Sequence, residues 1–283
     1  MRKLKVPDID FSDIYDDCTR KLHQPRKGNF VTIKPNMVSL KNSYVSNAEA
    51  QKLHTTPVDS GHSPLNSEDF KYLYTGKMLD KKGDARKHYD KLMLQSPNKV
   101  CPYCDFTPVN QLDHVLAKAH YSTMSITPEN LVPTCGPCNF SKKDKVLTIA
   151  KDLHLHPYFD DELKERWLHA KVIPTPKSIT FEYFVEKIDA WSDELNGRVE
   201  THFVTFDLKN RMEVIAGAEV SGLLELVSLY KTSPEVLKAH LIKLSSDSCV
   251  FKLNFWKTAM FCALRDSDWF CNGGVMNIEP DEE

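Results

Sequence analysis

The sequence lacks long apolar runs. No stretch of its 283 residues approaches the roughly 20 consecutive apolar residues of a membrane-spanning helix. The first residues, MRKLKVPDIDFSDIYDDC, are basic at the start, but no apolar segment follows them, so we expect no secretory signal. These absences predict a cytoplasmic protein with no membrane partner.

An excess of charge of one sign is also missing. The 37 Lys and Arg against 39 Asp and Glu leave a net charge of −2, which argues against a bulk nucleic-acid coat. The distribution is uneven, because residues 71–99 hold eight Lys or Arg and three Asp. Such a stretch is compatible with binding a phosphate backbone, and equally with a solvated helix face.

Internal repeats and low-complexity tracts are absent, and the element pattern indicates an α+β, mostly helical protein. We expect a partly helical segment over 1–98, a small metal-organised module over 99–150, and a mostly helical C-terminal domain over 151–283 that can dock a partner. Ser67 is a candidate helix cap after the loop-like stretch TTPVDSGHSPLNSED. Expected helices cover 84–95, 156–173, 211–230, 233–244 and 251–264, and an expected strand covers 200–208.

Eight cysteines are present, and four of them form two Cys-x-x-Cys pairs, Cys101 with Cys104 and Cys135 with Cys138. In a reducing cytosol such pairs more often bind metal than form disulfides. Zn²⁺ prefers four tetrahedral ligands, and Gly136 and Pro137 suit the tight turn that brings two thiolates to one ion. We therefore predict a structural zinc site. A redox dithiol and an iron–sulfur cluster are the alternatives, but a redox site needs only one pair.

The remaining cysteines show no ligand spacing. A free cysteine usually packs as a small apolar side chain. We expect Cys18, Cys249, Cys262 and Cys271 to be core residues.

The segment between and after the cysteine pairs reads QLDHVLAKAHYSTMSITPENLVPTCGPCNFSKK. Asp113-His114, then Asn130-Leu-Val-Pro, then CGPCN ending at Asn139 and a lysine run resemble the four-cysteine HNH endonucleases. The resemblance is sharp over residues 99–146, and it extends more weakly to bacterial phage-defence HNH proteins such as the Septu-type nuclease subunit. It implies a zinc-stabilised ββα-metal nuclease module with helical flanks.

The resemblance also assigns roles. His114 matches the general base, and Asp113 matches a metal-ligating carboxylate. Asn130 matches the residue that orients the loop carrying the base. Asn139 stands where the second metal ligand, often His, is found. Lys142 and Lys143 follow on the expected helix, where they can meet the phosphate backbone.

The chemistry of these residues suits phosphodiester hydrolysis. A neutral histidine can take a proton from water at cellular pH. Oxygen ligands from Asp113 and Asn139 favour Mg²⁺ or Mn²⁺, which would clamp the scissile phosphate. We therefore expect a metal-dependent endonuclease acting on DNA by default, with RNA or tRNA open. The resemblance further suggests an effector of bacterial antiviral defence that works with an ATPase partner.

A non-catalytic function is the alternative. An Asp-His pair is often a surface or capping pair, Asn130 can be a turn residue, and Asn139 can cap a helix. The chain would then be a zinc-organised module that binds nucleic acid or protein without turnover.

Overall fold

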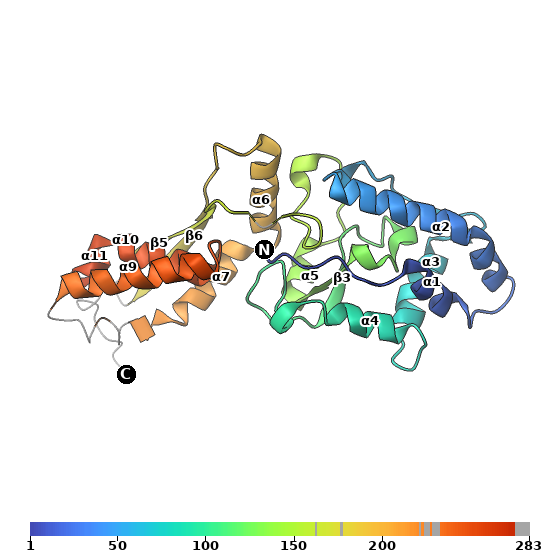
Figure 1. Cartoon of the computed structure of the whole chain (residues 1–283), viewed down its shortest axis with the longest axis horizontal. Coiled ribbons are helices and arrows are strands. Elements are labelled where there is room, and N and C mark those ends of the chain that lie inside the picture. Colours follow the sequence, from blue (N-terminus) through green and yellow to red (C-terminus); the bar gives the residue numbers. More distant parts are fainter. Residues whose placement is uncertain (162, 176–177, 221, 224–226, 228–232, 275–283) are drawn as a thin grey trace. The chain divides into compact units, whose positions relative to one another are not determined.

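A computed structural model describes residues 1–161, 163–175, 178–220, 222–223, 227 and 233–274 (Figure 1). The chain divides into two compact units, Met1–Glu162 and Leu163–Glu283. The sequence-based division placed boundaries after residues 98 and 150. The structure instead joins the N-terminal segment and the cysteine-rich segment in one unit.

The first unit contains five α-helices and two β-hairpins within its described residues. Short turns of 3₁₀-helix and one π-helical turn, η2, link them. The α-helices are α1 (Phe11–Thr19), α2 (Arg26–Glu49), α3 (Ser67–Tyr72), α4 (Arg86–Met93) and α5 (Gly136–Lys142), the strands are β1 (Gly61–His62), β2 (Leu65–Asn66), β3 (Gln111–His114) and β4 (Leu131–Thr134), and the turns are η1 (Leu53–Thr55), η2 (Leu73–Met78), η3 (Pro97–Lys99), η4 (Ser122–Met124), η5 (Pro128–Asn130) and η6 (Ala150–Asp152).

A hydrophobic core joins the N-terminal helices of the first unit to the β3–β4 hairpin. It gathers buried side chains of α1 to α4, and it also includes Leu112 of β3, Ile126 of the following loop and Leu131 of β4. The β3–β4 hairpin is therefore anchored on the N-terminal helices. The cysteine-rich segment therefore shares a core with the N-terminal helices and belongs to a larger unit.

The loop-like stretch over 55–69 is more ordered than its composition indicates. It contains the β1–β2 hairpin, and Asp59 accepts hydrogen bonds from the backbone N–H and the hydroxyl group of both Ser122 and Thr123. The cap of α3 is Asn66 rather than Ser67, and Asp69 completes a capping box. The stretch thus joins α2 and α3 to the loop between β3 and β4.

The second unit is built on one antiparallel hairpin, in which Leu168 pairs with Val185 and Pro174 with Ile179. Helix α10 packs against β5, α7 against β6, and α9 against α10. The elements are β5 (Leu168–Pro174), β6 (Ile179–Val185), α6 (Asp193–Thr205), α7 (Leu208–Gly217), α9 (Pro234–Phe251), α10 (Trp256–Asp266) and α11 (Asp268–Cys271).

Two element predictions in this unit are wrong. The expected strand over 200–208 is mostly helical, because α6 continues to Thr205 and α7 begins at Leu208. The expected helix over 156–173 is not formed in the described residues: 156–161 and 163–167 are turn or irregular backbone, and 168–173 belong to strand β5. Helix α9 confirms the prediction over 233–244, and α10 confirms most of that over 251–264. Part of the expected helix over 211–230 lies outside the described residues.

The α+β class is confirmed, with about half of the described residues helical and all their sheets two-stranded. Within the described ranges, no helix combines the length and apolar character needed to cross a bilayer.

Of the four cysteines expected in the core, Cys18, Cys262 and Cys271 are buried and Cys249 is half-buried.

Candidate metal centre and active site

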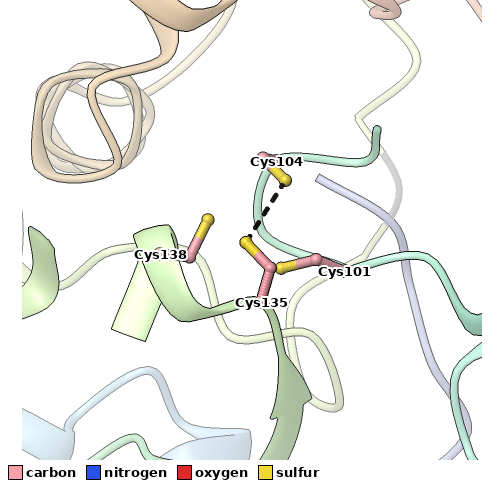
Figure 2. A group of neighbouring side chains, drawn as sticks. All are labelled: Cys101, Cys104, Cys135 and Cys138. Atoms are coloured by element: carbon pink, nitrogen blue, oxygen red, sulfur yellow. Dashed lines mark hydrogen bonds between the residues drawn. The ribbon is translucent and has the colours of Figure 1, made fainter. Parts of the chain in front are cut away.

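The two cysteine pairs converge on one point (Figure 2). The Sγ atoms of Cys101, Cys104, Cys135 and Cys138 all lie within 4.8 Å of one another, and all four residues are buried. The Sγ atoms of Cys104 and Cys135 are 3.9 Å apart. Zn–S bonds of about 2.3 Å in a tetrahedron require S···S distances of about 3.8 Å. The cluster therefore has the donors and spacing to hold a metal ion such as zinc.

The backbone around the first pair is shaped as a tight turn. The Asp105 N–H donates to the Cys101 carbonyl at 2.8 Å, and Asp105 has a φ of 70°. The neighbouring thiols, chiefly Cys101, lower the pKa of Cys104, and the backbone N–H of Phe106 adds a smaller contribution in the same direction. In the second pair, Cys135 caps α5, and the Asn139 N–H donates to its carbonyl at 3.1 Å. Helix α5 therefore starts at the metal cluster.

The four sulfur atoms lie so close together that a bound cation would stabilise their deprotonated forms. Burial raises the pKa of Cys101, whereas hydrogen bonds from neighbouring thiols, chiefly Cys101, lower the pKa of Cys104. Four thiolates this close would repel one another strongly in a buried site. A divalent cation removes that repulsion, and structural zinc contributes on the order of 10 kcal/mol to folding in small modules.

Asp113 lies on β3 opposite Val132 of β4 and is 3% exposed. Its Oδ2 accepts a hydrogen bond from the Tyr103 hydroxyl at 3.2 Å, and its Oδ1 lies 3.3 Å from the Lys142 ammonium. Burial raises the pKa of Asp113, although Lys142 and Tyr103 oppose this. Tyr103 thus holds one oxygen of the carboxylate, and the other oxygen faces the Lys142 ammonium.

His114 follows on β3 and is 6% exposed. Its Nε2 lies 2.9 Å from the Ser125 carbonyl, and its ring meets the Tyr74 ring edge-on at 4.5 Å. A carbonyl only accepts, so Nε2 carries the proton and neutral His114 has its lone pair on Nδ1. Burial, reinforced by Lys118, lowers the pKa of His114 to about 3, which keeps the ring neutral.

Asn130 is fully buried and holds the loop that follows His114. Its Oδ1 accepts from the Leu116 N–H at 2.7 Å, and its Nδ2 donates to the carbonyls of Leu116 and Met124 at 3.1 and 3.2 Å. Met124 directly precedes Ser125, whose carbonyl receives His114. Asn130 therefore fixes both the chain after the histidine and the segment that sets its tautomer.

Asn139 and Lys142 lie one turn apart on α5. Asn139 is half-buried, and Lys142 reaches β3, where it contacts Asp113 and donates to the carbonyls of His114 and Val115. Lys142 is 7% exposed, so the expectation that it meets the phosphate backbone is wrong. Lys143 ends α5 with a φ of 57° and is exposed, which leaves that role open to it.

Two aromatic residues of this region had no role in the sequence analysis. Tyr103 stands between Cys101 and Cys104 and binds Asp113, and Tyr74 packs on His114 from the π-helical turn η2. The place of Tyr103 inside the first cysteine pair is a signal that could have been used. Nothing in the sequence around Tyr74 indicates a partner 40 residues further along the chain.

Comparison with known proteins gives one similar chain, protein ea31 of Escherichia phage lambda. It is 29% identical over 301 aligned residues, which cover 96% of this chain and 100% of the phage protein. No family model matches the chain. No solved structure matches it.

Proposed function

We propose that the chain is a metal-dependent endonuclease of the HNH type, with its catalytic centre on β3, β4 and α5. The observation that carries the proposal is His114, whose Nε2 is bound to a carbonyl so that Nδ1 can accept a proton. A general base needs this state, and the adjacent Asp113 supplies a carboxylate for a cation.

The donor set fits a hard divalent cation. Asp113 already presents Oδ1 to the Lys142 ammonium, and Asn139 lies one turn before Lys142 on the same helix. Two oxygen donors leave room for water and a phosphate oxygen, as Mg²⁺ and Mn²⁺ prefer. When bound, such an ion would stabilise charge on the scissile phosphate and the leaving oxygen.

The residues of the chain then have separate tasks. His114 Nδ1 takes the proton of the attacking water. Asn130 holds the loop that orients His114, and Asp113 and Asn139 hold the cation. The cysteine cluster, as a structural zinc site, joins the start of α5 to the segment that precedes β3. DNA is the default substrate, because this hydrolysis needs no 2′-hydroxyl, and RNA or tRNA is the alternative.

The test compares wild type with His114→Ala on plasmid, single-stranded DNA and tRNA, with Mg²⁺ or Mn²⁺. Loss of a general base costs about 100-fold or more in rate. His62→Ala, which removes a histidine of the β1–β2 hairpin, is the matched control and should cut like wild type. If His114→Ala and wild type are equally inactive on every substrate, the endonuclease proposal fails.

A second function, a zinc-organised binding module without turnover, is favoured by one observation. Both carboxylate oxygens of Asp113 already have partners, Tyr103 and Lys142, in a site 3% exposed. In that case wild type would bind nucleic acid or a protein and cut nothing.

The biological setting is an extension of the proposal. A similar protein comes from Escherichia phage lambda. The proposed role in bacterial antiviral defence rests on the sequence resemblance, and the expected partner there is an ATPase. Co-purification with the products of neighbouring genes tests the partner.

A further inference from the structure

A pocket of about 460 Å³ lies in the first unit, between the start of α2, helix α3 and the loop after β3. The positively charged side chains of Arg26, Lys71 and Lys118 line this pocket. Glu68 and Asp69 also line it, so the cations exceed the carboxylates by one. The pocket brings together part of the basic stretch over 71–99 and the loop that carries Lys118.

Arg26 is held in a fixed orientation at this pocket. Its guanidinium carbon lies 4.6 Å from the centre of the Tyr72 ring, and its Nε lies 2.7 Å from Asp69 Oδ1. The Tyr72 ring rests on Gly76, where an added Cβ would approach a ring carbon to 2.2 Å. Among the described residues Arg26 Nη1 has no hydrogen-bond partner. An arginine fixed in this way loses little entropy when it binds an anion.

Lys118 connects the pocket to the proposed base. Its ammonium lies 5.5 Å from the centre of the Tyr74 ring, and Tyr74 packs edge-on against His114. No carboxylate of the described residues forms an ion pair with Lys118. Its positive charge is close enough to contribute, after burial, to the low pKa of His114. Tyr74 belongs to a π-helical turn, a feature common at functional sites.

We infer that this pocket binds the phosphate backbone of the substrate next to the cut, with Lys118 and Arg26 as the phosphate contacts. The inference deepens the proposed function and rests on it. The Lys118 ammonium, which lies near the proposed base, attracts a phosphate group. The Arg26 guanidinium, held by Tyr72 and Asp69, contacts a second phosphate and so fixes the path of the nucleic-acid strand.

The experiment measures binding of a short fluorescent DNA duplex by anisotropy, in the full chain with His114→Ala so that nothing is cut. Lys118→Gln is compared with Lys81→Gln, which changes an exposed lysine of the basic stretch over 71–99 that lies outside the pocket. We expect Lys118→Gln to raise the Kd several-fold. The slope of log K against log salt should also become less negative by about 0.9, the contribution of one phosphate contact on B-DNA. Lys81→Gln should change neither quantity.

Equal effects of the two substitutions on Kd and on salt slope would overturn the inference, even if wild type cuts DNA. The proposed function fails separately, if wild type binds DNA through Lys118 but never cuts it. A circular-dichroism melt of each variant shows that the fold is intact.

Discussion

Tyr103 is the residue that connects the cysteine cluster to the proposed catalytic carboxylate. It lies inside the first Cys-x-x-Cys pair, is fully buried, and donates its hydroxyl hydrogen bond to Asp113 Oδ2. Burial and the nearby Asp113 raise the pKa of Tyr103, so the hydroxyl keeps its proton and remains a donor. This bond orients one carboxylate oxygen, while the other faces the Lys142 ammonium, whose place a bound metal ion would take.

Replacing Tyr103 with Phe should therefore weaken metal binding at Asp113 without removing zinc. A hydrogen bond to a charged group is worth about 1.5–3 kcal/mol, which corresponds to roughly a tenfold or greater loss in Mn²⁺ affinity if the bond supports the bound geometry. Electron paramagnetic resonance titration with Mn²⁺ measures it directly, and a zinc assay follows the cysteine cluster.

Tyr121→Phe is the matched control for Tyr103→Phe. Tyr121 is also buried, in the same unit, and its hydroxyl has no hydrogen-bond partner in the described part of the chain. Its loss should leave Mn²⁺ affinity unchanged. An unaltered affinity in Tyr103→Phe as well would show that the hydroxyl does not position Asp113.

At the scale of elements, the β3–β4 hairpin and α5 are fixed by the cysteines at one end and by the hydrophobic core at the other. Cys135 follows β4 directly and caps α5, while Leu112 and Leu131 reach the core shared with the N-terminal helices. Helix α5 has only seven residues, too few to be stable alone in water. Its position against β3 therefore depends on the cluster and on Lys142.

Removing the metal should disorder this end of the unit first. Cys135→Ser, or a strong zinc chelator, is expected to release one zinc ion per chain, detach α5 and abolish cutting, while α1 and α2 keep their core. Hydrogen exchange by mass spectrometry should show faster exchange over 99–146 than over 11–49. Cys249→Ser, a cysteine outside the cluster, is the control. Uniform exchange after chelation would mean that the cluster does not support α5.

How far the sequence predicts elements depends on where their partners lie. The strand expected over 200–208 came from the partial alternation of apolar and polar residues in ETHFVTFDL, but Ser192 caps helix α6, which begins at Asp193 and continues to Thr205. The buried positions Arg198, Val199, His202 and Phe203 then follow helical spacing. Strand β5 was read as helix because Trp167 and Leu168 suit either element, and only its pairing with β6 decides.

The cysteine cluster was more predictable than the elements around it, because the two cysteines of each pair are close in sequence. The four cysteines meet as their spacing predicts, and Asp113 with His114 lies on a strand that leads away from them. Lys142 was misplaced because its long side chain turns inward to carbonyl groups of β3, which residue type alone does not indicate. The roles assigned to His114, Asn130 and Asn139 stay predictions.

At the scale of the whole molecule, the proposed nuclease occupies only the first of the two units. The similarity to the phage lambda protein nevertheless covers 96% of this chain. The second unit, built on β5, β6 and the helices beside them, contains none of the proposed catalytic residues. We interpret the second unit as the part of the chain that docks a partner protein, the function that the sequence analysis expected of the C-terminal domain.

This division predicts that residues 1–162 act as an enzyme without the rest. The first unit has its own core, the complete cysteine cluster, and every proposed catalytic residue. The fragment should therefore bind one zinc ion, melt cooperatively, and cut the substrate of the full chain at a rate within about tenfold, since the chemical step uses no group beyond it. The same fragment with His114→Ala is the control for contaminating nuclease. If the fragment folds with zinc bound yet cuts nothing that the full chain cuts, the second unit contributes to catalysis itself, and the assignment of the active site to the first unit alone is wrong.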